Sequence, residues 1–177
     1  TSPEKEQKHS FTMPANNVSL TANAKAIVYN ITYDLQGGAV NGKNPEEYTV
    51  ETPTFTLVNP TKQGYVFTGW TGSNGTTAQT SVSVVKGTTG DLHFIANWKA
   101  GTGIPYVVNH YTENLNGTSW TLNSTDNLQG TTGQVLTVAS LKKSITGFTY
   151  KEGKVNGSVV TTATVAADGS LVIDLYY

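Results

Sequence analysis

The chain repeats itself, and this repetition constrains its architecture more than any other feature of the sequence. The segment Gly90–Trp98 resembles Gly169–Tyr177 at the end of the chain. A second similarity links Tyr29–Gly37, near the start of the chain, with Val108–Gly117. Because internal similarity at a regular spacing marks tandem supersecondary units, the sequence predicts two modules built on one plan.

The repeat divides the chain into parts. Residues 27–100 are expected to form a first module and residues 104–177 a second, with residues 101–103 as a short flexible link. Residues 1–26 are interpreted as the remnant of a preceding repeat, because their end resembles the end of the first module. Since the chain starts at Thr1 and not at a methionine, we expect it to be a piece of something longer. Modules this small are marginal but can fold alone, with most contacts inside each one.

Alternating apolar side chains predict strands in both modules. The sets that share one strand face are Tyr29, Ile31, Tyr33 and Leu35; Leu92, Phe94, Ala96 and Trp98; and Leu171, Ile173, Leu175 and Tyr177. A weak helix signal covers residues 138–144, with Thr137 as a potential cap before it and Gly147 as a stop after it. In the matching part of the first module, Pro53 and Pro60 would break any helix longer than a turn. The expected fold class is therefore mainly β, α+β at most, with short or no helices.

The composition excludes several classes of protein. There is no cysteine, hence no disulfide, no thiolate nucleophile and no cysteine-ligated metal. All basic residues are lysines and the net charge is −1, which argues against a nucleic-acid partner. The apolar runs are far shorter than a membrane-spanning helix needs. We therefore expect no cofactor, no metal, no nucleic acid and no membrane insertion in this fragment.

The residues that could carry catalysis are scattered. His9, His93 and His110 are expected to be isolated strand or surface residues, whereas a metal site needs several ligands together. A serine–histidine–aspartate arrangement stays open from residue order alone, but no serine lies in a nucleophile elbow. The pair Glu46-Glu47 is expected to be solvated loop charge and not one half of a glycosidase site. The sequence predicts no catalytic residue and no enzyme.

The tryptophans divide into two groups. Trp70 and Trp98 end apolar motifs and are expected to lie in the core of the first module. Trp120 lies between Ser119 and Thr121, in a polar hairpin region, and is expected to be the most exposed. An exposed aromatic ring can stack on a sugar or a protein partner, which makes Trp120 the candidate ligand-binding residue, although a place at the edge of the core is an equal alternative.

The first module resembles a known repeat. Its opening strand, a central motif and its closing strand carry the resemblance: Tyr29–Gly38, Asn59–Trp70 and Ala96–Trp98. The central motif is Asn-Pro-Thr-Lys-x-Gly-Tyr-x-Phe-x-Gly-Trp, in which unlike residues stand at fixed spacing. Together these motifs resemble the Listeria–Bacteroides repeat, also called the internalin B-repeat type. The resemblance covers nearly all of residues 27–100.

The second module is more divergent. Its turn and core residues resemble the mucin-binding-type repeats of Gram-positive surface proteins: His110–Gly117, Gly130–Gly133, Ile145–Phe148 and Tyr176-Tyr177. Both resemblances imply a small β-grasp-like fold and extracellular repeat proteins of bacterial surfaces. Neither family has catalytic residues to transfer to this chain.

The resemblances lead to two hypotheses. The first is a non-enzymatic stalk or spacer in an adhesin-like cell-surface protein, attached to the cell wall through other parts of the parent, with neighbouring repeats as partners. The alternative is a binding module for a host glycan of mucin type or a host surface protein. A Lys–Asn isopeptide bond, which Gram-positive surface domains sometimes contain, is a further open alternative that an intact-mass measurement would test.

Overall fold

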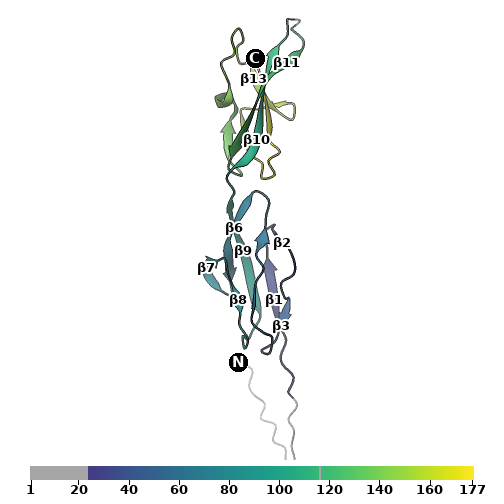
Figure 1. Ribbon diagram of the computed structural model, residues 1–177, viewed down its shortest axis with the longest axis vertical. Coiled ribbons are helices and arrows are strands. Elements are labelled where there is room, and N and C mark those ends of the chain that lie inside the picture. The colour runs from purple at the N-terminus through teal and green to yellow at the C-terminus, as the bar shows by residue number, and fades with distance from the viewer. Residues whose placement is uncertain (1–23, 116) are drawn as a thin grey trace, which may run out of the picture.

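The computed structural model describes residues 24–115 and 117–177, and it is mainly β (Figure 1). It contains two five-stranded sheets and three two-stranded ones. One hydrophobic core gathers residues between Tyr29 and Trp98, and a separate one gathers residues between Ile104 and Tyr177. The mainly β prediction is confirmed. The predicted remnant of a preceding repeat lies almost wholly outside the described residues.

The sheet of the first module has the order β3-β1-β9-β6-β7. Its strands are β1 (Tyr29–Asp34), β3 (Glu47–Tyr48), β6 (Tyr65–Gly72), β7 (Gly75–Gln79) and β9 (Leu92–Ala100). Two small antiparallel pairs accompany it: β2 (Ala39–Val40) with β5 (Pro60–Thr61), and β4 (Phe55–Thr56) with β8 (Ser83–Val84). The first long strand, β1, pairs in parallel with the last, β9, while β6 pairs antiparallel with β9 on its other side.

The sheet of the second module has the corresponding order, β11-β10-β16-β13-β14. Its strands are β10 (Ile104–Glu113), β11 (Trp120–Gly130), β13 (Glu152–Val155), β14 (Ser158–Val159) and β16 (Val172–Tyr176). A small antiparallel pair joins β12 (Val135–Thr137) to β15 (Thr162–Thr164), and the 3₁₀-helix η1 (Val138–Leu141) follows β12. Here too the first strand, β10, pairs in parallel with the last, β16. A sheet whose parallel first and last strands lie at its centre is the β-grasp-like arrangement that the resemblance implied.

A bulge in β6 directs two aromatic side chains into the core of the first module. The register between β6 and β9 shifts between Phe67 and Gly69, so both Phe67 and Trp70 turn towards the core although strict alternation would separate them. Gly69 has φ +133°, and a Cβ there would lie 2.5 Å from the backbone nitrogen of Gln79. The glycine of the Phe-x-Gly-Trp motif is therefore required by a close backbone approach.

The weak helix signal over residues 138–144 corresponds to a single 3₁₀ turn, in agreement with the expectation of short or no helices. Thr137 makes no capping hydrogen bond with its side chain, and Lys142 is already extended. The reason is tertiary, because Thr137 is still paired with Thr162 of β15 and Val138 donates its N–H to the Thr161 carbonyl at 2.9 Å. A chain held by a neighbouring strand at its first helical residue has little freedom to continue a helix.

Candidate functional site

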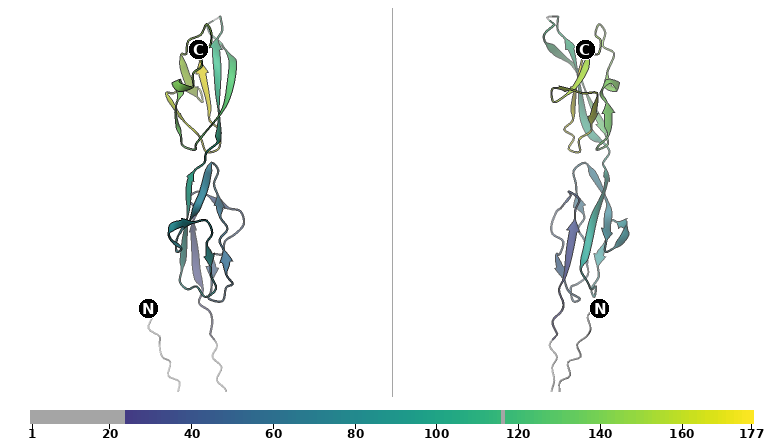
Figure 2. Two further views of the ribbon diagram at one scale, coloured as in Figure 1. Left: turned by 60° about the vertical axis from the view of Figure 1, so that its left-hand side comes forward. Right: turned by 180° about the vertical axis from the view of Figure 1, so that it is seen from behind.

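The joint between the modules is the first candidate site. Figures 1 and 2 show the two modules end to end, with β9 leading into β10. Gly101 is buried, donates its N–H to the Gly64 carbonyl at 2.9 Å, and accepts the Thr132 N–H at 2.9 Å. The Thr132 hydroxyl also donates to the Gly64 carbonyl. Ala167 lies so close that a Cβ on Gly64 would be 2.3 Å from its carbonyl oxygen.

The flexible link predicted at residues 101–103 is therefore wrong for Gly101. Its backbone is bonded to the turn before β6 and to the turn after β11, so both modules hold it. A Gly-Thr-Gly sequence predicts a flexible backbone only when no other part of the protein is bonded to it. The partners come from Gly64 and Thr132, which are distant in the sequence, so no local pattern could have revealed them.

The second candidate site surrounds Trp120 on the solvent face of the second sheet. Trp120 is partly exposed, and its ring meets Tyr176 edge-on, with 4.9 Å between ring centroids and 80° between planes. Tyr176 in turn stacks on Tyr111 at 5.3 Å and 15°. We call these three rings the aromatic platform. The cross-strand pairs Tyr111–Tyr176 and Glu113–Trp120 hold the rings on one face.

Two lysines lie on the aromatic platform. The Lys151 ammonium is 5.0 Å from the centroid of Trp120, and the Lys154 ammonium is 4.7 Å from that of Tyr176. Each is also paired with a carboxylate, Lys151 with Glu113 at 2.7 Å and Lys154 with Glu152 at 2.8 Å. The hydrogen bond to Glu152 raises the pKa of Lys154. A flat ligand could stack on Trp120 only where Lys151 moved aside.

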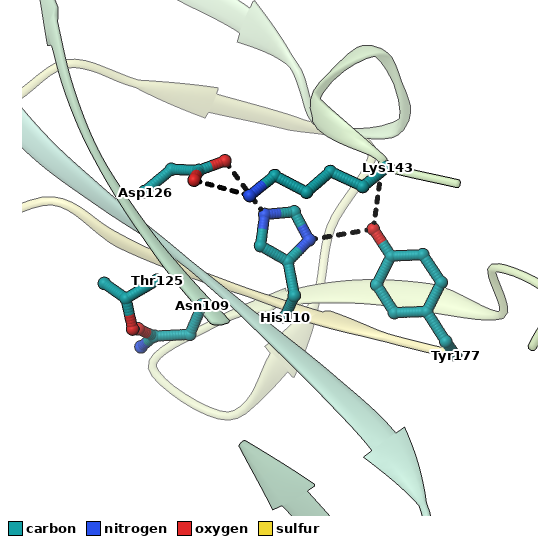
Figure 3. A network of polar contacts seen from close by, with 6 residues as sticks. All are labelled: Asn109, His110, Thr125, Asp126, Lys143 and Tyr177. Carbon is teal, nitrogen blue, oxygen red and sulfur yellow. Dashed lines mark hydrogen bonds and ion pairs between the residues drawn. The ribbon is translucent and has the colours of Figure 1, made fainter. Parts of the chain in front are cut away.

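The third candidate site is a polar network inside the second module (Figure 3). His110 is fully buried; its Nδ1 is 2.9 Å from the Tyr177 hydroxyl and its Nε2 is 3.2 Å from Asp126 Oδ2. Asp126 Oδ1 pairs with the Lys143 ammonium at 2.5 Å. This hydrogen bond is the largest cause of the lowered pKa of Asp126, and a further bond from His110 acts in the same direction.

The prediction of isolated histidines is thus wrong for His110. His93 is an exposed residue of β9 that bonds to Thr32, as expected of a surface histidine, and His9 lies outside the described residues. One signal could have identified His110: it continues the alternation of Tyr106 and Val108, which places it on the core face of its strand.

The network has a tyrosine, a histidine and an aspartate in the order of a nucleophile, a base and an orienting acid. Tyr177 is only 2% exposed and His110 is 0% exposed. A reacting group must touch its substrate, and these two cannot do so in this conformation. In this conformation the network bonds β10, β11, the segment at Lys143 and the end of the chain to one another.

The other tryptophans serve the core. Trp70 is fully buried, donates its indole N–H to Asn59 Oδ1 at 2.9 Å, and contacts Tyr33, Phe67 and Phe94. Trp98 is partly buried, packs against the same core, and donates to the Leu35 carbonyl at 3.1 Å. The prediction of a core role is confirmed for both, whereas ligand binding at Trp120 stays a prediction.

Comparison with known families agrees with this architecture. Residues 29–97 match the family model of the Listeria-Bacteroides repeat domain. The first module thus matches a known repeat family. The Listeria-Bacteroides repeat is found in surface proteins and is typically non-catalytic. No curated protein matches the chain. Across the described residues, no helix has the length and apolar character to span a membrane. The likeness of the second module to mucin-binding-type repeats stays a prediction.

Proposed function

We propose that the two modules are a non-enzymatic spacer in the extracellular stalk of an adhesin-like bacterial surface protein, anchored to the cell wall through other parts of that protein. The observation that carries this proposal is the joint of Gly64, Gly101, Thr132 and Ala167, which fastens the modules end to end. A spacer has to keep its length, and a joint bonded from both sides resists bending.

The strand topology supports the same role. The chain enters each module at one end of the first strand and leaves at the opposite end of the last strand, since the two strands are parallel neighbours. A pull on the two ends therefore shears the ladder, and its hydrogen bonds must yield together. The ladders pair Ile31–Asp34 with Leu92–Ile95 and Val107–Tyr111 with Val172–Tyr176. Such a module is suited to bearing tension.

Replacing Gly64 with alanine is expected to loosen the joint while leaving both modules folded. The new Cβ would collide with the backbone of Ala167. Gly157→Ala is the matched control, because Gly157 has a similar φ, +77° against +73°, but open space around it. Small-angle scattering and NMR relaxation should show one extended rigid particle for the wild type and the control, and independent tumbling of the modules for Gly64→Ala. Independent tumbling of the wild type would contradict the proposal.

The aromatic platform supports a second candidate, a binding module for a host glycan. Three rings lie together on a solvent face beside the hydrogen-bonding side chains of Asn109, Thr125 and Asp174. On this hypothesis Trp120→Ala should weaken binding to a mucin-type glycan about tenfold. Val135→Ala is the control, because Val135 is an exposed residue of β12, which belongs to a different sheet from the platform. Glycan-array and titration measurements would compare the affinities of the two variants. Equal binding by both would exclude the platform as the glycan-binding site.

A further inference from the structure

The segment of residues 142–149, which we call the strap, connects η1 to the region before β13. Its backbone is tied to the rest of the module by Lys143, whose N–H donates to the Tyr177 hydroxyl at 2.9 Å. Gly147, Phe148 and Thr149 of the strap line a groove together with Tyr177. One backbone hydrogen bond of the strap therefore depends on how the Tyr177 hydroxyl uses its one proton and its lone pairs, while the Lys143 ammonium is paired separately with Asp126 and Ile145 packs against the core.

With a neutral His110, every group in this network has a partner. Because the Asp126 carboxylate can only accept, Nε2 is the nitrogen that carries the proton and donates to it, while Nδ1 accepts a hydrogen bond from the Tyr177 hydroxyl. The Tyr177 oxygen remains free to accept the N–H of Lys143. Figure 3 shows the imidazole between Asp126 of β11 and Tyr177, which follows β16, with Lys143 of the strap bonded to both of these residues.

A protonated His110 changes this arrangement. Nδ1 then also carries a proton and becomes a donor to Tyr177, so the hydrogen bond between them reverses. The Tyr177 oxygen receives two donors, and its own proton loses its acceptor in a buried place. A buried donor without a partner is costly, so the hydroxyl has to reorient, and a reoriented hydroxyl proton competes with the N–H of Lys143 for space at the oxygen.

We propose that His110 and Tyr177 form an acid-sensitive latch, which holds the Lys143 backbone of the strap at neutral pH and loosens that one bond when His110 takes up a proton. The other titratable groups of this network and its surroundings are Asp126, Lys143, Tyr177 and Tyr150. Asp126 stays charged because its pKa is lowered, chiefly by its hydrogen bond with Lys143. Tyr150, whose ring packs on Tyr177, has a pKa raised by burial.

The latch is tested by amide hydrogen exchange of the whole chain at pH 7.5 and pH 5, corrected for intrinsic exchange. The protection of the Lys143 amide should fall about tenfold or more at the lower pH. The amides of Val138 and Leu57 are internal controls, because they donate to Thr161 and Val82, away from the network. Their protection should change little.

Two variants separate the latch from general acid sensitivity. His110→Gln cannot titrate in this range, so its Lys143 protection should be the same at both pH values. Tyr177→Phe lacks the acceptor, so its Lys143 amide should be poorly protected at both. An equal acid response in the wild type and His110→Gln would overturn the proposal. Nitrogen-15 shifts of His110 in the wild type give a test that needs no variant: the imidazole should be neutral at pH 7.5, and neutrality at pH 5 would also overturn it.

Discussion

Replacing Trp70 with alanine is expected to cost about 3–5 kcal/mol of the free energy of unfolding of the first module. The side chain is 0% exposed and lies at the centre of an aromatic cluster, so its removal leaves a cavity and orphans the Asn59 amide oxygen. Small domains have total stabilities of only about 5–15 kcal/mol, so the variant should be largely or wholly unfolded in this module. Amide NMR spectra and denaturant unfolding would measure the loss.

Two further variants define the cause of this loss. Trp120→Ala removes the same side chain from a partly exposed site in the second module and should cost about 1 kcal/mol. Trp70→Phe keeps a ring in the core but leaves Asn59 without its donor, so its cost should lie between the two. A Trp70→Ala variant that is as stable as Trp120→Ala would show that the first core does not depend on this ring.

Pulling the first module through its two ends should require much more force than peeling it open from one edge. The chain has no cysteine, so single cysteine handles can be placed freely. Val28→Cys with Lys99→Cys loads the parallel β1–β9 ladder in shear, because the two residues lie at opposite ends of it. Shear must break several hydrogen bonds at once, so single-molecule experiments should record a high unfolding force.

The matched control is Val66→Cys with Lys99→Cys. Val66 and Lys99 are directly opposed on the antiparallel β6–β9 ladder, so pulling on them separates the strands one bond at a time. Both valines are about half exposed, at 50% and 46%, so the substitutions should affect stability similarly. Equal unfolding forces for the two pairs would contradict the idea that the module bears tension in a stalk. The joint would then still set a fixed spacing between the modules.

The strands of both modules were predictable because alternation is a local property of the sequence. Leu92, Phe94 and Ala96, and likewise Leu171, Ile173 and Leu175, face their cores as their spacing predicts. Alternation failed at the bulge in β6, where Gly69 shifts the phase between Phe67 and Trp70. The motif there was visible in the sequence, but the register shift depends on the approach of the Gln79 backbone from β7.

The candidate sites were less predictable, because each is made by residues that are distant in the sequence. Trp120 was identified as a polar-flanked aromatic, but Tyr111, Tyr176 and Lys151 complete its surroundings only when the sheet forms. His110 was expected to be isolated, and its partners Asp126 and Tyr177 come from β11 and from the end that follows β16.

By itself, the sequence of this protein determined the repeat, the mainly β class and the resemblance of the first module to the Listeria-Bacteroides repeat, because apolar period, turn residues and motif spacing are written along the chain. The tertiary structure decided that Gly101 is held in a joint, that Thr137 begins only one helical turn, and that His110 is buried in a network. In each case the deciding partner lies on another strand or turn, and hydrogen bonds across such distances leave no local pattern in the sequence.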